Sequence, residues 1–151
     1  MCAPFHVLIA TPDKEAVANA RERLLAHDGI IETVTSCDSV DTAAAHMKAS
    51  ASDYLVVVVD LPGDRDTWAA LIGRVLDAAP DSGVLALCQG LTPADAALAI
   101  DAGARHAVPK EEVLDPKANG RLAEAAVQVA AAMRIARGRR KAALREVIDR
   151  R

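Results

Sequence analysis

The stretch Asp-Tyr-Leu-Val-Val-Val-Val-Asp-Leu-Pro-Gly, residues 53–63, predicts the centre of the fold. Its apolar run, Leu55–Val59, consists mostly of β-branched valine and is bounded by Asp53 and Asp60. A short run of this kind favours a strand that is buried on both faces, as in the middle of a parallel sheet. Open α/β sheets keep their sites where the strands end, so Asp60 is a candidate site residue. Its alternative role is to cap the following helix.

Strands and helices are predicted to alternate along the rest of the chain. Further strands are expected at His6–Ala10, Ile30–Thr35, Val84–Cys88 and Arg105–Val108, and helices at Asp13–His27, Val40–Ala49, Asp66–Ala79 and from Thr92 to Gly103. A loop is expected at Pro109–Glu111, and a last helix from about Pro116 or Arg121 to Arg151, either unbroken or divided at Gly138. Five strand–helix pairs predict an α/β fold, a parallel sheet joined by right-handed crossovers with helices on both faces.

Two loops contain residues that favour helix starts. Thr11 is expected to cap the first helix, with Pro12 in its first turn. Thr92 and Asp95 resemble a capping box in which Asp takes the place of Glu.

Composition limits the class of protein. The chain has 151 residues, enough for one domain, and its apolar content of 52% includes only 2% aromatic residues. No apolar run is long enough for a membrane span, and the first one, Val7–Ala10, is too short for a secretory signal. Three cysteines without metal-ligand spacing fit a reduced, cytoplasmic setting, and we expect no metal and no cofactor.

Charge divides the chain into two parts. Residues 134–151 hold eight Lys and Arg against two acids, a net charge of +6, whereas residues 1–133 have a net charge of −9. We therefore expect a domain at 1–133 and a basic helical extension at 134–151, or a linker to an output module. A chain that ends within such a helix is consistent with a fragment of a longer protein.

The order of elements resembles the receiver domain of bacterial two-component response regulators over about residues 5–133. The resemblance rests on the first, third and fourth strands, the loop after the third strand, the turn before the fifth and a lysine after it: Val7–Ile9, Asp53–Val57, Leu61–Gly63, Val84–Leu87, Ala102–Ala104 and Lys110. It implies a CheY-like, flavodoxin-like strand order of 2-1-3-4-5. Lys110 stands where the family keeps its invariant lysine.

Four other functional places of the family are changed, with its pair of metal-binding acids counted as one. The phosphoacceptor aspartate, four residues before the loop proline, corresponds to Val58, and the two acids after the first strand correspond to Thr11 and Pro12. The switch hydroxyl corresponds to Cys88 and the switch aromatic to Ala107. Because Mg²⁺ requires oxygen ligands, the resemblance implies an atypical receiver, or pseudo-receiver, that is not phosphorylated in the conventional way.

Two acids leave an alternative open. Asp60 and Asp13 lie within two residues of the expected acidic places, and a shift of two residues preserves the face of a strand. Asp60 would then be the phosphoacceptor, although Pro62 would follow it after two residues instead of four. A third hypothesis is a small-anion sensor near Lys110. Cys88 completes the candidate binding residues, as a buried small residue or as a redox-sensitive thiol. Alternation along the third strand predicts Val56 and Val58 on one face of the sheet and Val57 and Val59 on the other. We expect Val58 to be buried and Asp60 to be exposed.

The favoured hypothesis is a non-enzymatic signal-transduction domain that acts through protein contacts. Its partners would be a second copy, an output domain or a regulator, and its switching face would be the fourth helix, fifth strand and fifth helix. An apolar stripe from Leu122 to Met133 continues to Leu144 and Ile148, which predicts a homodimer through the C-terminal helix, paired with a second copy as a parallel signalling helix. One alternative is a solvated linker helix, and another is the binding of anionic lipid or nucleic acid by residues 134–141. Because aromatic residues to stack bases are absent there, no direct nucleic-acid contact is expected.

Overall fold

A parallel β-sheet forms the middle of the domain. The computed structural model describes residues 4–27, 29–50, 54–115 and 121–149. Its sheet has the order β2-β1-β3-β4-β5, as expected. The strands are β1 (Phe5–Ala10), β2 (Ile31–Cys37), β3 (Tyr54–Leu61), β4 (Gly83–Cys88) and β5 (His106–Pro109).

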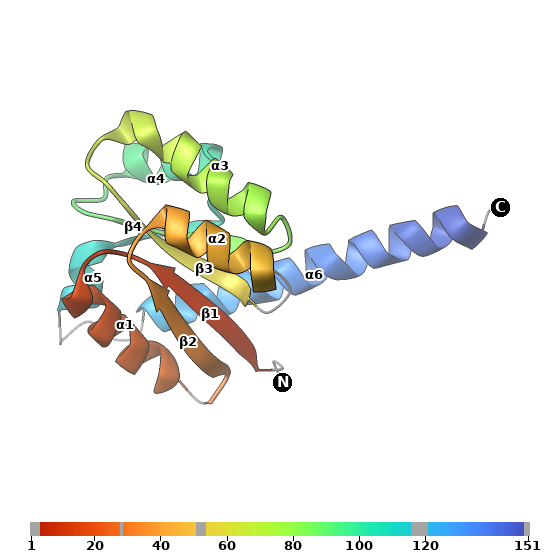
Figure 1. The fold of residues 1–151 in the computed structure, drawn as a ribbon, viewed down its shortest axis with the longest axis horizontal. Coiled ribbons are helices and arrows are strands. Elements are labelled where there is room, and N and C mark those ends of the chain that lie inside the picture. The colour runs from red at the N-terminus through yellow and green to blue at the C-terminus, as the bar shows by residue number, and fades with distance from the viewer. Residues whose placement is uncertain (1–3, 28, 51–53, 116–120, 150–151) are drawn as a thin grey trace.

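Helices cover both faces of this sheet. They are α1 (Lys14–Leu25), α2 (Val40–Ser50), α3 (Trp68–Ala78), α4 (Pro93–Asp101), α5 (Lys110–Leu114) and α6 (Arg121–Asp149), with a 3-10 turn, η2 (Arg65–Thr67), before α3. Figure 1 shows α1 and α6 against one face of the sheet and α2, α3 and α4 against the other. The C-terminal part of α6 extends past the body of the domain. Among the described residues, no helix combines the length and apolar character needed to cross a bilayer.

The predicted alternation of the central strand is confirmed. Val56 and Val58 pack in the apolar cluster under α1 and α6, whereas Val57 and Val59 pack in the cluster under α2, α3 and α4. All four side chains are fully buried, Val58 included. The strand is longer than the apolar run, however, because β3 also contains Tyr54, Asp60 and Leu61. Asp53 lies outside the described residues.

The first helix begins differently from the prediction. Asp13, not Thr11, is its N-cap, and the Asp13 carboxylate accepts hydrogen bonds from the main-chain N–H groups of Glu15 and Ala16. Pro12 consequently precedes the helix instead of lying in its first turn. The capping box at the start of α4 is confirmed, with reciprocal hydrogen bonds between Thr92 and Asp95.

The segment after β5 was predicted to be a loop, and this was wrong. Pro109, in an extended conformation, precedes the short helix α5, which begins at Lys110. Two acids, Glu111 and Glu112, lie in its first turn, where the partial positive charge of the helix start stabilises them. A five-residue helix is too short to leave a periodic pattern in the sequence.

The last helix is one continuous element. It runs through Gly138 without a break, since this glycine has open space around it and strong helix formers on both sides. Its N-terminal half is buried on the sheet through Leu122, Ala123, Ala125, Ala126, Val129, Ala130 and Met133. Gly83 permits this close packing, because a Cβ atom there would lie 2.5 Å from Cγ1 of Val129. The alternative start at Pro116 lies outside the described residues.

Candidate functional site

A cluster of four polar side chains lies at the carboxyl edge of the sheet. The Thr11 hydroxyl, after β1, donates a hydrogen bond of 2.7 Å to Oδ2 of Asp60 at the end of β3. The Lys110 ammonium, at the start of α5, lies 2.8 Å from the same oxygen and 3.3 Å from Oδ2 of Asp13. The structure thus brings together three candidate residues, Asp60, Asp13 and Lys110, with Thr11 as a fourth member.

Asp60 was expected to be exposed at the mouth of the loop, and this was wrong. Only 9% of its side-chain surface is exposed, because Thr11 and Lys110 cover the carboxylate. Thr11 is itself held in place, since its oxygen accepts a hydrogen bond from the main-chain N–H of Asp13. The alternative role of Asp60 as a helix cap is also wrong. Asp64 caps the turn after β3 instead, through the N–H of Asp66.

The charges in the cluster stabilise one another. Hydrogen bonds from the Ala16 N–H and from Lys110 hold the pKa of Asp13 below its usual value. Burial lowers the pKa of Lys110, but the hydrogen bonds and negative charges of Asp60 and Asp13 outweigh it, so the pKa of Lys110 is raised. The lysine therefore stays protonated, as a cation shared by two carboxylates.

The chemistry available to this cluster follows from the position of the ammonium. A divalent cation needs several oxygen ligands, and no group of three or more potential metal-ligating side chains occurs among the described residues. Both carboxylates present already contact the Lys110 ammonium, which offsets one of their two negative charges. An incoming anion would likewise have to displace Asp60 and Asp13 from the lysine. The cluster is thus satisfied internally.

A pocket of about 270 Å³ adjoins the cluster. It is lined by Pro12, Asp60, Leu61, Pro62, Gly63, Arg65, Trp68, Gln89 and Lys110. Its second cation, Arg65, makes two hydrogen bonds to the buried carboxylate of Asp95 at the start of α4. The Trp68 indole N–H donates to the Pro62 carbonyl at 2.7 Å. The cations beside this pocket therefore already have carboxylate partners.

Sequence reasoning did not find the Arg65–Asp95 pair. The arginine holds the pKa of Asp95 at about 2, well below its usual value, with help from the hydrogen bonds of Thr92. Asp95 had been recognised only as part of a capping box. Arg65 begins the three-residue turn η2, which is too short for a periodic pattern, so the sequence carried no signal for the contact. The pair joins the loop after β3 to the first turn of α4.

Cys88 is the remaining candidate residue. Cys88 ends β4, opposite Leu61 in the register, and is buried as the small-residue alternative predicted. Burial, together with the charge of Asp95, raises the pKa of the Cys88 thiol to about 11. The reactive thiolate that redox sensing requires is therefore disfavoured.

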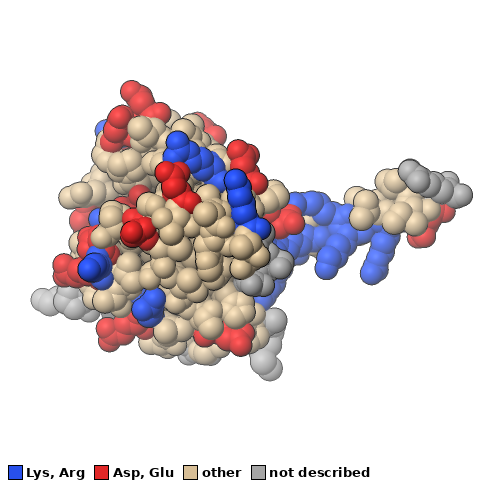
Figure 2. Space-filling view, in the orientation of Figure 1, with Lys and Arg blue, Asp and Glu red and all other residues tan. Residues whose placement is uncertain are grey.

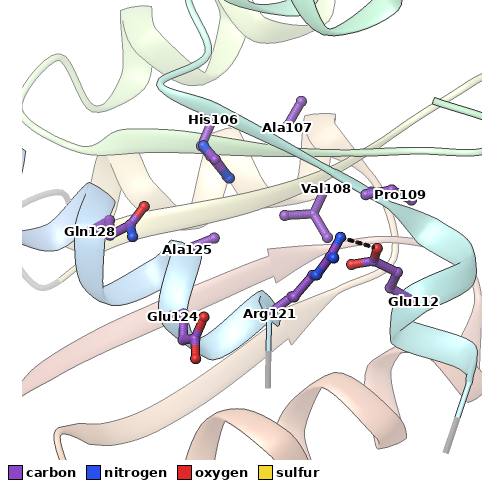
Figure 3. Close-up of a pocket in the computed structure, with 9 residues that line it drawn as sticks. All are labelled: His106, Ala107, Val108, Pro109, Glu112, Arg121, Glu124, Ala125 and Gln128. Atoms are coloured by element: carbon purple, nitrogen blue, oxygen red, sulfur yellow. Dashed lines mark hydrogen bonds and ion pairs between the residues drawn. The ribbon is translucent and has the colours of Figure 1, made fainter. Parts of the chain in front are cut away.

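A second pocket, also of about 270 Å³, lies between β5 and α6 (Figure 3). His106 extends into it from β5, and Glu124 and Gln128 line it from α6. At one end Arg121 donates a 2.7 Å hydrogen bond to Oε1 of Glu112, while Oε2 of Glu112 is buried and has no hydrogen-bond partner within the described part of the chain. The face expected to act in switching thus has a polar depression.

Solved structures show what this fold is similar to. The sequence matches no family model and no curated protein. A response regulator from Thermotoga maritima superposes with a TM-score of 0.69 at 17% identity, covering 85% of this chain and 98% of its own. A response regulator from Hahella chejuensis superposes with a TM-score of 0.67 at 16% identity, covering 83% of this chain and 94% of its own. A pilus assembly-related protein from Burkholderia pseudomallei superposes with a TM-score of 0.64 at 20% identity, covering 84% of this chain and 90% of its own. The chain has a CheY-like receiver fold. At these identities the likeness shows the fold alone.

Proposed function

We propose that this chain is a non-enzymatic, cytoplasmic signalling domain, an atypical receiver that acts through protein contacts without aspartate phosphorylation. The observation that carries the proposal is the Lys110 ammonium, held between Asp60 and Asp13. In this position the lysine occupies one oxygen of each of the two carboxylates of the cluster, which a metal-dependent phosphoryl transfer would need as free ligands.

The position of the family's acceptor supports the same proposal. Val58, the residue that the sequence resemblance assigns to it, is fully buried, so its side chain can neither accept a phosphoryl group nor reach solvent. The resemblance assigns the places of the two metal-binding acids to Thr11, whose hydroxyl donates a hydrogen bond to Asp60, and to Pro12, which has no side-chain donor or acceptor.

A second candidate function has one observation in its favour. Asp60, Asp13, Thr11 and Lys110 converge at the edge of the sheet, so an acceptor shifted by two residues would have an acid, a hydroxyl and a lysine beside it. In this alternative Asp60 is phosphorylated once Mg²⁺ displaces the lysine from the carboxylates. The small-anion sensor ranks below it, because both carboxylates compete for Lys110.

Phosphorylation chemistry tests the two candidates against each other. The chain is incubated with acetyl phosphate and Mg²⁺ and examined by intact mass spectrometry, and with beryllofluoride and Mg²⁺ by fluorine NMR. We expect neither a phosphate adduct nor a bound-fluoride signal, because no free carboxylate pair is present to hold the metal. A receiver of known phosphorylation activity is the positive control.

Asp60→Asn is the matched variant for this experiment, since it keeps the shape of the side chain and removes the nucleophile. An adduct on the parent chain that disappears in Asp60→Asn would establish the alternative. Thermal unfolding of both chains shows whether the variant remains folded.

The proposed partners are proteins: a second copy, an output domain or a regulator. One solved structure of similar fold comes from a pilus assembly-related protein, which adds an assembly apparatus to the possible settings. The polar depression between β5 and α6 supports the switching face proposed there. Leu144, Val147 and Ile148 are exposed at the end of α6, which supports self-association through this helix.

A further inference from the structure

A groove of about 520 Å³ follows one side of α6 where the helix passes the start of β5. Its lining combines two cations with three apolar side chains: Arg105, Ala132, Ile135, Ala136 and Arg139. Ile135 is 57% exposed, and neither arginine has an ion pair within the part of the chain that is described. The groove therefore offers unpaired positive charge above an apolar floor.

The far end of the same helix has the opposite character. Glu146 and Asp149 are exposed acids without an ion pair among the described residues, and they flank the exposed side chains of Val147 and Ile148. Figure 2 shows Lys and Arg side chains along α6 where it leaves the body, and a less basic surface toward its end. An acidic, apolar segment of this kind complements the groove.

Charge decides the direction in which two such helices can pair. Residues 134–141 contain five cations and no acid, whereas residues 142–149 contain one cation and two acids. In a parallel pair each segment lies beside its own copy, so five cations face five cations. In an antiparallel pair the basic segment of one copy lies beside the more acidic segment of the other. Only the antiparallel arrangement is complementary in charge.

The helix also has a suitable stripe for this arrangement. Ala136, Arg139, Ala143 and Glu146 recur at intervals of three and four residues, so they lie on one side of α6. If two antiparallel helices cross between Ala142 and Ala143, the small side chains permit close approach. Arg139 of one copy is then nearly level with Glu146 of the other.

We propose that the end of α6 of a second copy lies antiparallel in this groove, with its Val147 on Ala136 and its Glu146 beside Arg139. This inference rests on the self-association part of the proposed function and names the surface that carries it. The same contact occurs twice, once in each copy, as a twofold dimer requires.

Charge reversal in the full-length chain tests the arrangement. We expect Arg139→Glu and Glu146→Arg each to weaken the dimer by about tenfold, because each variant turns two symmetry-related attractions into repulsions. The double variant, Arg139→Glu with Glu146→Arg, restores the pairing and returns the dissociation constant to within about threefold of the parent value. Sedimentation equilibrium measures the dimer, and both positions are on exposed helix surface, so folding is unaffected.

Two further variants keep the outcomes distinct. Lys48→Glu on α2 makes the same change of charge on exposed surface away from α6 and leaves the dimer unchanged. Val147→Glu dissociates any dimer formed by the end of the helix. Val147→Glu could dissociate the dimer while the charge reversals have no effect. That result would overturn the antiparallel arrangement but would still show that the dimer forms through the end of α6. A parent chain that stays monomeric at about 100 µM would overturn both, independently of the phosphorylation result.

Discussion

The two halves of α6 are parts of one helix, yet they are held by different forces. Residues 121–133 bury an apolar stripe on the sheet, where Met133 is 2% exposed. Within the described part of the chain, the polar contacts of residues 134–149 with the body come from arginines, chiefly Arg137, which donates two hydrogen bonds to the Asp81 carbonyl, and Arg140, which pairs with the Asp81 carboxylate. Burial of apolar side chains stabilises the first half of the helix against the sheet, whereas the exposed polar contacts fix the direction of the second half and add little to the free energy of folding.

The largest expected effect concerns the core beneath the first half. Val58→Asp should lower the free energy of unfolding by about 4 kcal/mol, because an unpaired carboxylate is buried among apolar side chains. The loss should be smaller at about pH 4 than at about pH 7, since burial favours the neutral acid, which becomes available as the pH falls. Urea denaturation at the two pH values measures both.

Val58→Ala is the control for this substitution, because it removes side-chain volume without adding a charge. An unchanged urea midpoint for Val58→Asp would mean that the edge of the sheet is open to solvent near Val58, and that the packing under α6 is looser than described.

An intermediate effect is expected where the first half crosses β4. Gly83→Ala places a Cβ atom 2.5 Å from Cγ1 of Val129 and 2.7 Å from Cγ of Met133, so the strand or the helix must shift. We expect a loss of about 2 kcal/mol in the free energy of unfolding, as for other overpacked cores. Thermal unfolding is the measurement.

Gly138→Ala is the matched control in the second half of the helix. A Cβ atom there meets nothing within 4 Å, and alanine favours helix more than glycine does, so the chain should gain up to about 1 kcal/mol. If Gly83→Ala and Gly138→Ala changed the stability in the same direction, the two halves of α6 would not differ in how tightly they pack.

The smallest effect on stability is expected at Asp81. Asp81→Ala removes the carboxylate that pairs with Arg140 but keeps the carbonyl that binds Arg137, so the loss should stay below about 1 kcal/mol. Arg137→Ala should loosen residues 134–149 more, because it removes both hydrogen bonds to that carbonyl. Hydrogen exchange of the amides in this segment compares the two variants, and equal exchange would show that neither contact sets the direction of the helix.

The sequence predicted what depends on local pattern. The alternation from Val56 to Val59 and the order of the strands follow from apolar runs and the turns between them, and both are confirmed. The burial of Asp60 could not be predicted, because it depends on Thr11 and Lys110, which lie about fifty residues away on either side and come together only in the sheet.

Two further features escaped prediction for related reasons. The pair of Arg65 with Asp95 joins a loop to a helix start thirty residues later, and neither residue alone has a pattern that indicates a partner. The helix α5 is shorter than two turns, so periodicity could not separate it from a loop, although the resemblance to receivers had already identified Lys110 at its start.

The short helix α5 has a consequence for how the site comes into being. A helix of five residues does not form by itself in water. Carbonyl groups near the end of α5 accept hydrogen bonds from a residue that is far away in the sequence. The Arg23 guanidinium, on α1, donates to the main-chain oxygens of Glu112 and Asp115, across 89 and 92 residues of sequence. Closing loops of that length costs chain entropy, which only the assembled sheet and helices repay. Lys110 can therefore reach Asp60 only after the first and last parts of the domain have met, so a peptide copied from either side of the cluster would not reproduce it.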